Sequence, residues 1–368
     1  MECLVSSAEQ CGGRRPGRRW CISALVGVWC KQACSGPPLL SRGSNCNCFN
    51  CSNCNTRMVL YIAGTPIDTI PQDLRTLFQL YPHLKEGARH LCSLPAKCVG
   101  PVGLLYVSQR ELAVTVPHDR NVSVLGTDDC TTCHMAVFRH TASGATGLTH
   151  LDSCEHEEPL QTILQRIAEL SKGYPAGRVQ LHIVGGYRDS RGVSEEVSLS
   201  LLNALSKSPY EVDVITCCLG ELNTITRDGM NWPVVYGVGV NVETGELFPA
   251  TFPDKGPDMA LRHARFYTGG HQQFLDIYDC QQGLLRIGPF NYEPLRKVDL
   301  WLQQSDKVLL KHLSTSPEVE PPHFAMQARA SLKYIQEHPF PASTVFPDGR
   351  PHFFRKDQLS GQWVQISS

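Results

Sequence analysis

Short stretches in which apolar and polar residues alternate recur along the chain after residue 100. Alternation with a period of two is typical of strands that bury one face. It predicts strands at residues 103–107, 112–116, 122–125, 135–138, 146–149, 179–184 and 212–219, and a hairpin of 233–241 with 247–252 around Thr244-Gly245. Several of these strands follow one another across short polar breaks, which favours antiparallel neighbours.

Apolar residues with helical spacing lie between the predicted strands. Leu160, Ile163 and Ile167 recur at intervals of three and four, after a proline that suits the first turn of a helix. Further helices are predicted at residues 84–94, 197–205, 306–313 and 324–336. Hairpins mixed with helices, without an internal repeat or an evident linker, predict a layered α+β domain in which helices cover a mixed or mostly antiparallel sheet.

Composition changes this picture only at the N-terminus. The 368 residues carry 34 Lys and Arg against 35 Asp and Glu, but residues 1–57 hold seven of the basic residues, two of the acidic ones and nine of the 17 cysteines. We expect residues 1–57 to be a disordered, basic, cysteine-rich extension without a role in the chemistry, and residues 58–368 to form the domain. The globular pattern that follows Met58 also suggests an alternative or misassigned start upstream of it.

Two features leave other roles open for this extension. Arginines at positions 14, 15, 18 and 19 precede a short apolar run at 22–29, an order that resembles a targeting peptide. Cys46, Cys48, Cys51 and Cys54 have a spacing that could bind zinc through thiolates. No histidine and no recognisable scaffold surround these cysteines, so a disordered extension is favoured over a zinc finger.

The charge and cysteine pattern of the body argues against several classes of protein. Its 27 basic and 33 acidic residues form no sustained basic stripe, which argues against nucleic-acid binding. It has no apolar stretch of about 18 residues, so no transmembrane helix is expected. Its eight cysteines are irregularly spaced, which favours a reducing compartment over a disulfide framework. We expect a monomer.

The densest group of reactive residues is Cys130-Thr-Thr-Cys133-His134, which permits three interpretations. It matches the pattern of covalent haem attachment, but a strand is predicted after it instead of a haem-binding helix. It could be a thioredoxin-like redox pair, but no helical period follows the first cysteine. The third interpretation is one nucleophilic cysteine, because a hairpin that starts near Cys133 and returns to His150 would bring thiol and imidazole to one end.

Several motifs, which occur in a fixed order along the chain, resemble the protein N-terminal asparagine amidohydrolase family. They are LLYVSQRELAVT (104–115), LGTDD (125–129), TTCH (131–134), HIVGG (182–186), RIGP (286–289), WLQQ (301–304), STSP (314–317) and EPPHF (320–324). The resemblance spans essentially all of residues 58–368 and none of residues 1–57. Family members usually begin near the position of Met58 with proline second, whereas Val59 follows here.

The resemblance implies an intracellular hydrolase, cytoplasmic and also nuclear, that converts an N-terminal Asn of a protein to Asp and releases ammonia. The product would be a substrate for arginylation and ubiquitin-dependent turnover. No metal or cofactor is implied. The nucleophile of the family corresponds to Cys133, whereas Cys130 lies outside the motif. The spacing of Thr127, Cys133 and His150 is also similar to the Cys-His-Thr arrangement of bacterial chemoreceptor glutamine deamidases.

In such a site, His150 would take the proton of Cys133 and Thr127 would orient the imidazole, and water would hydrolyse a thioester intermediate. Backbone N–H groups at residues 132–134 are candidates for an oxyanion hole. His134 is a candidate substrate contact, although alternation should turn its side chain to the opposite face of the strand and favours a structural role.

Restriction to a chain terminus requires a group that binds the α-ammonium, and a carboxylate suits that charge. Asp128, Asp129 and Glu221 are the candidates, although the two aspartates could simply form a turn. A non-catalytic module that recognises free protein N-termini is the alternative function. The presence of both Cys133 and His150 favours catalysis, because a binding module needs no nucleophile.

Overall fold

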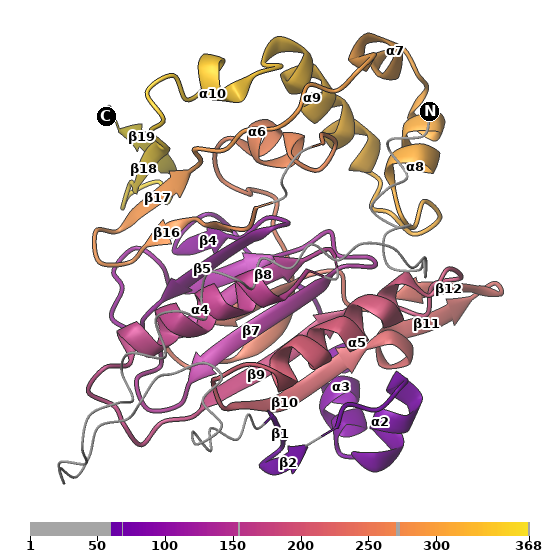
Figure 1. Cartoon of the computed structure of the whole chain (residues 1–368), viewed down its shortest axis with the longest axis vertical. Helices are drawn as coiled ribbons and strands as arrows, with labels where there is room; N and C mark the ends of the chain where they lie inside the picture. The colour runs from indigo at the N-terminus through magenta and orange to yellow at the C-terminus, as the bar shows by residue number, and fades with distance from the viewer. Residues whose placement is uncertain (1–59, 68, 154, 270–272, 367–368) are drawn as a thin grey trace, which may run out of the picture. The chain divides into compact units, whose positions relative to one another are not determined.

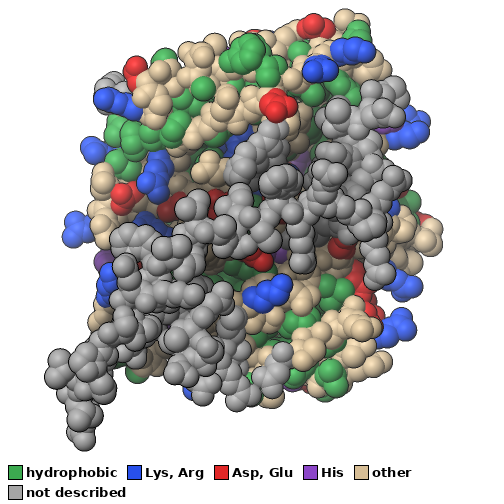
Figure 2. Space-filling view, viewed as in Figure 1, with side chains coloured by type: hydrophobic (Ala, Val, Ile, Leu, Met, Phe, Trp, Pro, Cys, Tyr) green, Lys and Arg blue, Asp and Glu red, His purple; other side chains and the backbone are tan. Residues whose placement is uncertain are grey.

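The computed structural model describes residues 60–67, 69–153, 155–269 and 273–366. The predicted extension, with its targeting and zinc motifs, lies outside the described residues. Among the described residues, no helix is both long and apolar enough to cross a membrane. On the face shown in Figure 2, the acidic and basic side chains that are visible are interspersed, so neither sign of charge dominates it.

An eight-stranded mixed sheet carries much of the domain (Figure 1). In spatial order its strands are β15 (Leu275–Asp276), β5 (Glu111–Thr115), β8 (Thr146–Leu151), β7 (His134–His140), β9 (Val179–Gly185), β10 (Val212–Leu219), β1 (Leu60–Ile62) and β2 (Thr65–Ile67). Strand β7 is antiparallel to both of its neighbours, β8 and β9. Strands β9, β10 and β1 run parallel to one another.

A five-stranded sheet packs against one face of this large sheet. Its order is β3 (Lys97–Cys98), β14 (Leu247–Thr251), β13 (Val238–Asn241), β6 (Val124–Thr127) and β4 (Leu104–Tyr106). Val137 and Leu148 of the large sheet belong to the same buried cluster as Leu125 and Val240 of the smaller one. The candidate site described below lies where these two sheets face each other.

Helices cover the other face of the large sheet, where α4 (Glu157–Leu170) and α5 (Val193–Ser206) lie across it in Figure 1. Ile163 and Ile167 of α4 share one buried cluster with Phe138 of β7 and Leu201 of α5. Helices α2 (Leu74–Leu80) and α3 (Leu84–Ser93) add to the same cluster. The apolar residues that recur at helical spacing are therefore the ones that bury this face.

The C-terminal third adds short helices and a small antiparallel sheet. The helices are α6 (Met259–Ala264), α7 (Val298–Leu302), α8 (Asp306–Leu313), α9 (Phe324–Glu337) and α10 (Pro341–Thr344), which gather at the top of Figure 1. The sheet consists of β16 (Tyr278–Asp279), β17 (Leu284–Ile287), β18 (His352–Lys356) and β19 (Trp363–Ile366). A 3-10 turn, η1 (Gly220–Asn223), leads into the hairpin of β11 (Thr224–Arg227) and β12 (Met230–Pro233).

The predicted fold class, an α+β domain with a mixed sheet covered by helices, is confirmed. One boundary differs in a way that matters for the site: the strand predicted at 122–125 is β6, which runs from Val124 to Thr127. Several short strands were not predicted, among them β1, β2, β17, β18 and β19. In β19, none of the four residues is fully buried and alternation is absent.

Candidate active site

Three strand ends meet where the two large sheets face each other. Strand β6 ends at Thr127, β7 begins directly after Cys133, and β8 ends one residue after His150. A hydrogen bond of 2.8 Å between Thr127 Oγ1 and His150 Nδ1 joins the two sheets. The structure therefore brings together the three residues that were predicted to be catalytic.

The register of β7 and β8 places Cys133 and His150 on the same face of the large sheet. Met135 pairs with His150, and His134 pairs with Leu151. Side chains alternate between faces along a strand, so residue 133 shares the face of Met135. Diagonal neighbours across an antiparallel pair are within reach of long side chains. The thiol is thus a diagonal neighbour of the imidazole.

The neighbouring strand fixes the backbone of Cys133. The Gly186 N–H donates a hydrogen bond of 2.8 Å to the carbonyl oxygen of Cys133, and Gly185 pairs with His134. A Cβ atom at Gly185 would lie 2.4 Å from that same carbonyl oxygen, closer than real Cβ contacts allow. The absence of a side chain at position 185 therefore permits the close approach that holds Cys133 in place.

His150 is buried, and only one of its ring nitrogens has a hydrogen-bond partner among the described residues. Thr127 satisfies Nδ1, whereas Nε2 has no partner there. Burial lowers the pKa of His150 to about 4, so the ring is neutral near pH 7. When Nδ1–H donates to the Thr127 hydroxyl, Nε2 carries the lone pair that can accept a proton.

Cys133 is partly exposed, and its thiol is the protonated form near pH 7. Burial raises the pKa of this thiol well above its ordinary value, and the charges of Asp152 and Glu320 raise it further. The guanidinium of Arg110 acts in the opposite direction. A neutral thiol beside a neutral imidazole is therefore the resting state of the pair.

Cys130 is fully buried and has a structural contact. Its thiol donates to the carbonyl oxygen of Cys133 over 2.7 Å, and burial raises the pKa of the thiol. The sulfur is thus directed to the backbone of the turn. A strand, β7, follows this segment, so neither the helix of a haem site nor that of a thioredoxin-like pair follows the second cysteine.

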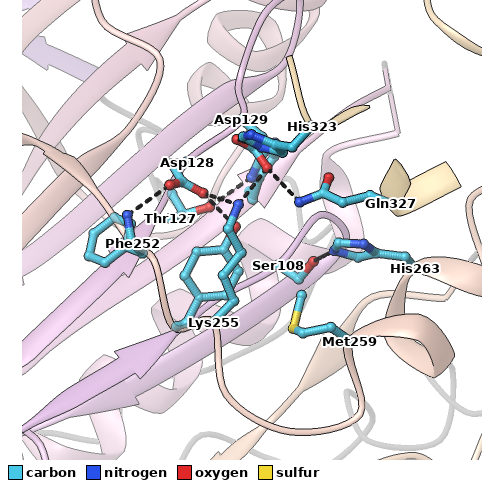
Figure 3. Close-up of polar contacts among 12 residues, drawn as sticks. Ser108, Thr127, Asp128, Asp129, Phe252, Lys255, Met259, His263, His323 and Gln327 are labelled. Atoms are coloured by element: carbon cyan, nitrogen blue, oxygen red, sulfur yellow. Dashed lines mark hydrogen bonds and ion pairs between the residues drawn. The ribbon is translucent and has the colours of Figure 1, made fainter. Parts of the chain in front are cut away.

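Asp128 is held in a buried polar network (Figure 3). The Lys255 ammonium lies 2.6 Å from Asp128 Oδ1 and also contacts Asp129. The Tyr106 hydroxyl and the backbone N–H of Phe252 donate to the two carboxylate oxygens over 2.9 and 3.0 Å. All the hydrogen bonds of Asp128 in this network are made within the chain.

Asp129 both forms the turn and accepts several hydrogen bonds. Its φ of 59° lies in the left-handed region, which aspartate adopts more readily than most residues. His323 Nε2 donates to Oδ1 over 2.9 Å, and Gln327 donates to Oδ2 over 3.3 Å (Figure 3). Burial alone would raise the pKa of Asp129, but the hydrogen bond from His323 and the charge of Lys255 outweigh burial and lower it.

The structure does not bring His134 or Glu221 to the thiol. His134 is fully buried on the helix-covered face, with Nε2 2.6 Å from Ser198 Oγ of α5. This position fits the structural role that alternation favours. Glu221 is exposed in η1, and no hydrogen bond or ion pair among the described residues joins it to the site.

Asp152 lies beside the thiol but was not predicted as a site residue. It follows β8 directly, its side chain is 4% exposed, and its Oδ2 accepts from Arg110 Nε over 2.6 Å and from Gln109 Nε2 over 2.5 Å. Its Oδ1 has no partner among the described residues. Its place two residues after His150 was visible in the sequence.

The loop at residues 314–320 reaches the site from far downstream. Ser316 Oγ donates to Thr131 Oγ1 over 2.8 Å, and Thr132 Oγ1 lies 2.8 Å from Thr315 Oγ1. This loop brings Glu320 towards Cys133. Sequence reasoning included Glu320 and His323 in the EPPHF motif but gave them no role, because no local pattern connects that motif to the thiol.

No group of three or more His, Cys, Asp or Glu side chains suited to a metal ion occurs in the part of the chain that the structure describes.

Comparison with known proteins agrees with the motifs. Residues 94–365 match the family described as protein N-terminal asparagine amidohydrolase. The Sus scrofa protein of that name is 42% identical over 311 residues, which are 84% of this chain and 99% of that protein. The Homo sapiens protein is 41% identical with the same coverage, and the Arabidopsis thaliana protein is 28% identical over 70% of this chain and 80% of its own length. The chain belongs to the protein N-terminal asparagine amidohydrolase family, and it is an enzyme of that family.

Proposed function

We propose that this enzyme hydrolyses the side-chain amide of an N-terminal Asn, with Cys133 as the nucleophile. The names of the family and of the relatives support the substrate. The observation that supports the nucleophile is the arrangement around His150: a buried imidazole with one nitrogen bonded to Thr127, the other without a partner among the described residues, and a thiol on the same sheet face.

The first step transfers the Cys133 proton to His150 Nε2 while the sulfur attacks the side-chain carbonyl carbon of Asn. Because burial disfavours both the thiolate and the imidazolium, this proton moves as the carbon–sulfur bond forms. In this mechanism Thr127 accepts the Nδ1–H bond, which leaves the lone pair on Nε2 to take the proton of the thiol. Backbone N–H groups at residues 132–134 hold the oxyanion, and one such donor typically contributes about 10²–10³ in rate.

The second step expels ammonia and forms a thioester. The carbon–nitrogen bond breaks, and the proton on His150 Nε2 passes to the leaving nitrogen. Water then gives a proton to His150 and adds to the thioester carbon. The sulfur leaves and recovers its proton, so that Asp and the free thiol result. The net reaction consumes one water for each ammonia released.

The product, a protein with N-terminal Asp, is a substrate for arginylation and ubiquitin-dependent turnover, in the cytoplasm and also the nucleus. The family resemblance is the support for this pathway and location. We propose that the enzyme acts as a monomer and without a cofactor.

The test is an assay with two peptides that differ only in the first residue, Asn or Gln. We expect ammonia release and the mass shift of deamidation for the Asn peptide. Absence of product from the Asn peptide would contradict the proposed reaction, and binding without turnover would favour a module that only recognises N-termini. Equal turnover of the Gln peptide would contradict the specificity for Asn.

A further inference from the structure

An enzyme that acts on N-terminal Asn must distinguish it from Asn inside a chain. The two differ in the α-amino group, which is mostly an ammonium at pH 7. A carboxylate close to Cys133 that is not already neutralised would bind this charge. The following assignment rests on the proposed function, because it names the residue that would bind the α-ammonium of the substrate.

Three carboxylates around the thiol already have a cationic partner. Asp128 and Asp129 share the Lys255 ammonium, and Asp129 also accepts from His323. Asp152 Oδ2 forms an ion pair with Arg110 Nε over 2.6 Å, and the two side chains are 4% and 10% exposed. A carboxylate that is paired in this way attracts a second cation weakly, because the first partner cancels its charge.

Glu320 differs from these three. No Lys, Arg or His of the described residues forms an ion pair with it. Its polar contacts are with two neutral hydroxyls: Ser314 donates to Oε1 over 2.5 Å, and Ser316 Oγ lies 3.5 Å from the same oxygen. Two hydroxyl dipoles orient a carboxylate without cancelling its charge. The second oxygen, Oε2, has no hydrogen bond among the described residues.

The loop that carries Glu320 is fastened to the turn that carries the nucleophile. The bonds from Ser316 to Thr131 and between Thr315 and Thr132 reach the two residues directly before Cys133. Glu320 is close enough for its charge to raise the pKa of the Cys133 thiol. The carboxylate therefore lies within electrostatic range of the reacting carbon's position.

We propose that Glu320 binds the α-ammonium of the substrate and thereby restricts the reaction to chain termini. Ser314 and Ser316 hold Oε1, and Oε2 receives the ammonium.

Burial disfavours the ionised form of Glu320 as long as no cation is bound to it. Desolvation, followed by the negative charge of Asp129, raises the pKa of Glu320 to about 7 despite the hydrogen bonds from the two serines and the charge of His323, which lower it. An ammonium bound at Oε2 would favour the ionised carboxylate and reverse this effect. The position is thus matched to a ligand of positive charge.

The test compares a peptide that begins with Asn and the same peptide in which a succinamoyl group replaces the Asn. The second peptide keeps the carboxamide but lacks the α-amino group. We expect the wild type to prefer the Asn peptide about 10- to 100-fold in kcat/KM, the range for a hydrogen bond to a charged group. In Glu320→Gln this preference should fall to near one, mainly through a higher KM for the Asn peptide, because the ammonium is unchanged during the reaction.

Two other variants, Asp129→Asn and Asp152→Asn, are the matched controls. Each removes one carboxylate charge near the thiol, and each should slow both peptides alike and keep the preference. A merely structural role of Glu320 would also slow both peptides alike. Retention of the full preference in Glu320→Gln, or its loss in Asp152→Asn, would overturn the assignment.

Glu320→Asp provides a second measurement that keeps the charge. The shorter side chain withdraws the carboxylate from the substrate, so an intermediate preference is expected, and an undiminished preference contradicts the proposal. These outcomes are separate from a failure of the proposed reaction, in which the wild type itself would release no ammonia from the Asn peptide.

Discussion

His134 and His150 lie on opposite faces of the same sheet and share several properties. Each is buried, each has one ring nitrogen bonded to a hydroxyl, and each has a second nitrogen without a side-chain partner among the described residues. Burial lowers the pKa of His134 to about 3 and that of His150 to about 4. Burial, a hydroxyl partner and a shifted pKa therefore do not identify a catalytic histidine.

The surroundings of the two rings distinguish them. His134 contacts Ser198 on a helix that covers an apolar face. His150 shares its face with a thiol, and charged groups, Asp152, Asp129 and Lys255, act on its pKa. An unpartnered ring nitrogen has chemical meaning when a nucleophile and acidic groups lie around it. Substitutions on the two faces test this distinction.

Substitutions of the two cysteines, Cys130 and Cys133, should show the largest difference in activity. Cys133→Ala should lower kcat/KM by about 10⁴-fold or more, because the nucleophile is lost. Cys130→Ala should leave turnover measurable and cost stability instead, because a buried side chain that donates to the Cys133 carbonyl is removed. Steady-state kinetics with the Asn peptide and urea unfolding measure the two effects. Activity that survives in Cys133→Ala but not in Cys130→Ala would identify Cys130 as the nucleophile.

Substitutions of the two histidines should show the second largest difference in activity. His150→Gln should reduce kcat by about 10²–10⁴-fold, the usual contribution of a general base. His134→Gln should lower the free energy of unfolding by about 1–3 kcal/mol through the lost bond to Ser198 while the folded protein stays active. Rates normalised to the folded fraction check this. Equal losses of rate in both variants would show that the two faces are not functionally distinct.

Substitutions of Thr127 and Ser198, the hydroxyl partners of the two histidines, should show the same difference between the faces with smaller effects. Thr127→Val removes the acceptor for Nδ1–H, and we expect kcat to fall about 10- to 100-fold, whereas Thr127→Ser should restore most of the rate. Ser198→Ala, the matched change on the helix-covered face, should affect unfolding and not kcat. A full rate in Thr127→Val would exclude an orienting role for this hydroxyl.

The pH dependence of stability should not distinguish the two histidines. Both pKa values are lower in the folded protein than the ordinary value of about 6.5, so the unfolded chain binds more protons below that pH. Each ring should therefore lower the free energy of unfolding as the pH falls from about 6.5 to about 4, by up to about 1.4 kcal/mol per pH unit. Urea unfolding across this range should show a shallower dependence in either Gln variant than in the wild type. A shallower dependence in only one variant would mean that the other ring is protonated in the folded protein.

Local patterns predicted those parts of the fold that rest on local burial. Alternation identified β5, β7 and β8, which lie buried between the helices and the smaller sheet, and spacing of three and four identified α4, which buries one face. The hairpin of β7 and β8 was also enough to place Cys133 near His150. The exposed strand β19 carries no such pattern and was missed.

The parts of the site that depend on distant segments could not be predicted in this way. Lys255 meets Asp128 and Asp129, and the loop at 314–320 meets the turn before Cys133, only because the chain returns to this point after many other elements. The sequence showed that Asp128 and Asp129 were acidic and close to Cys133 along the chain. It did not show that cations within the chain already neutralise them.

The close approach at Gly185 limits how this sequence can vary. A Cβ atom at residue 185 would lie only 2.4 Å from the Cys133 carbonyl oxygen. Relief would require the segment that carries Cys133 to shift relative to the strand that carries His150. A methyl group at this position of β9 would thus misalign the proposed catalytic pair, so the proposed mechanism requires glycine at residue 185 as well as the thiol of Cys133.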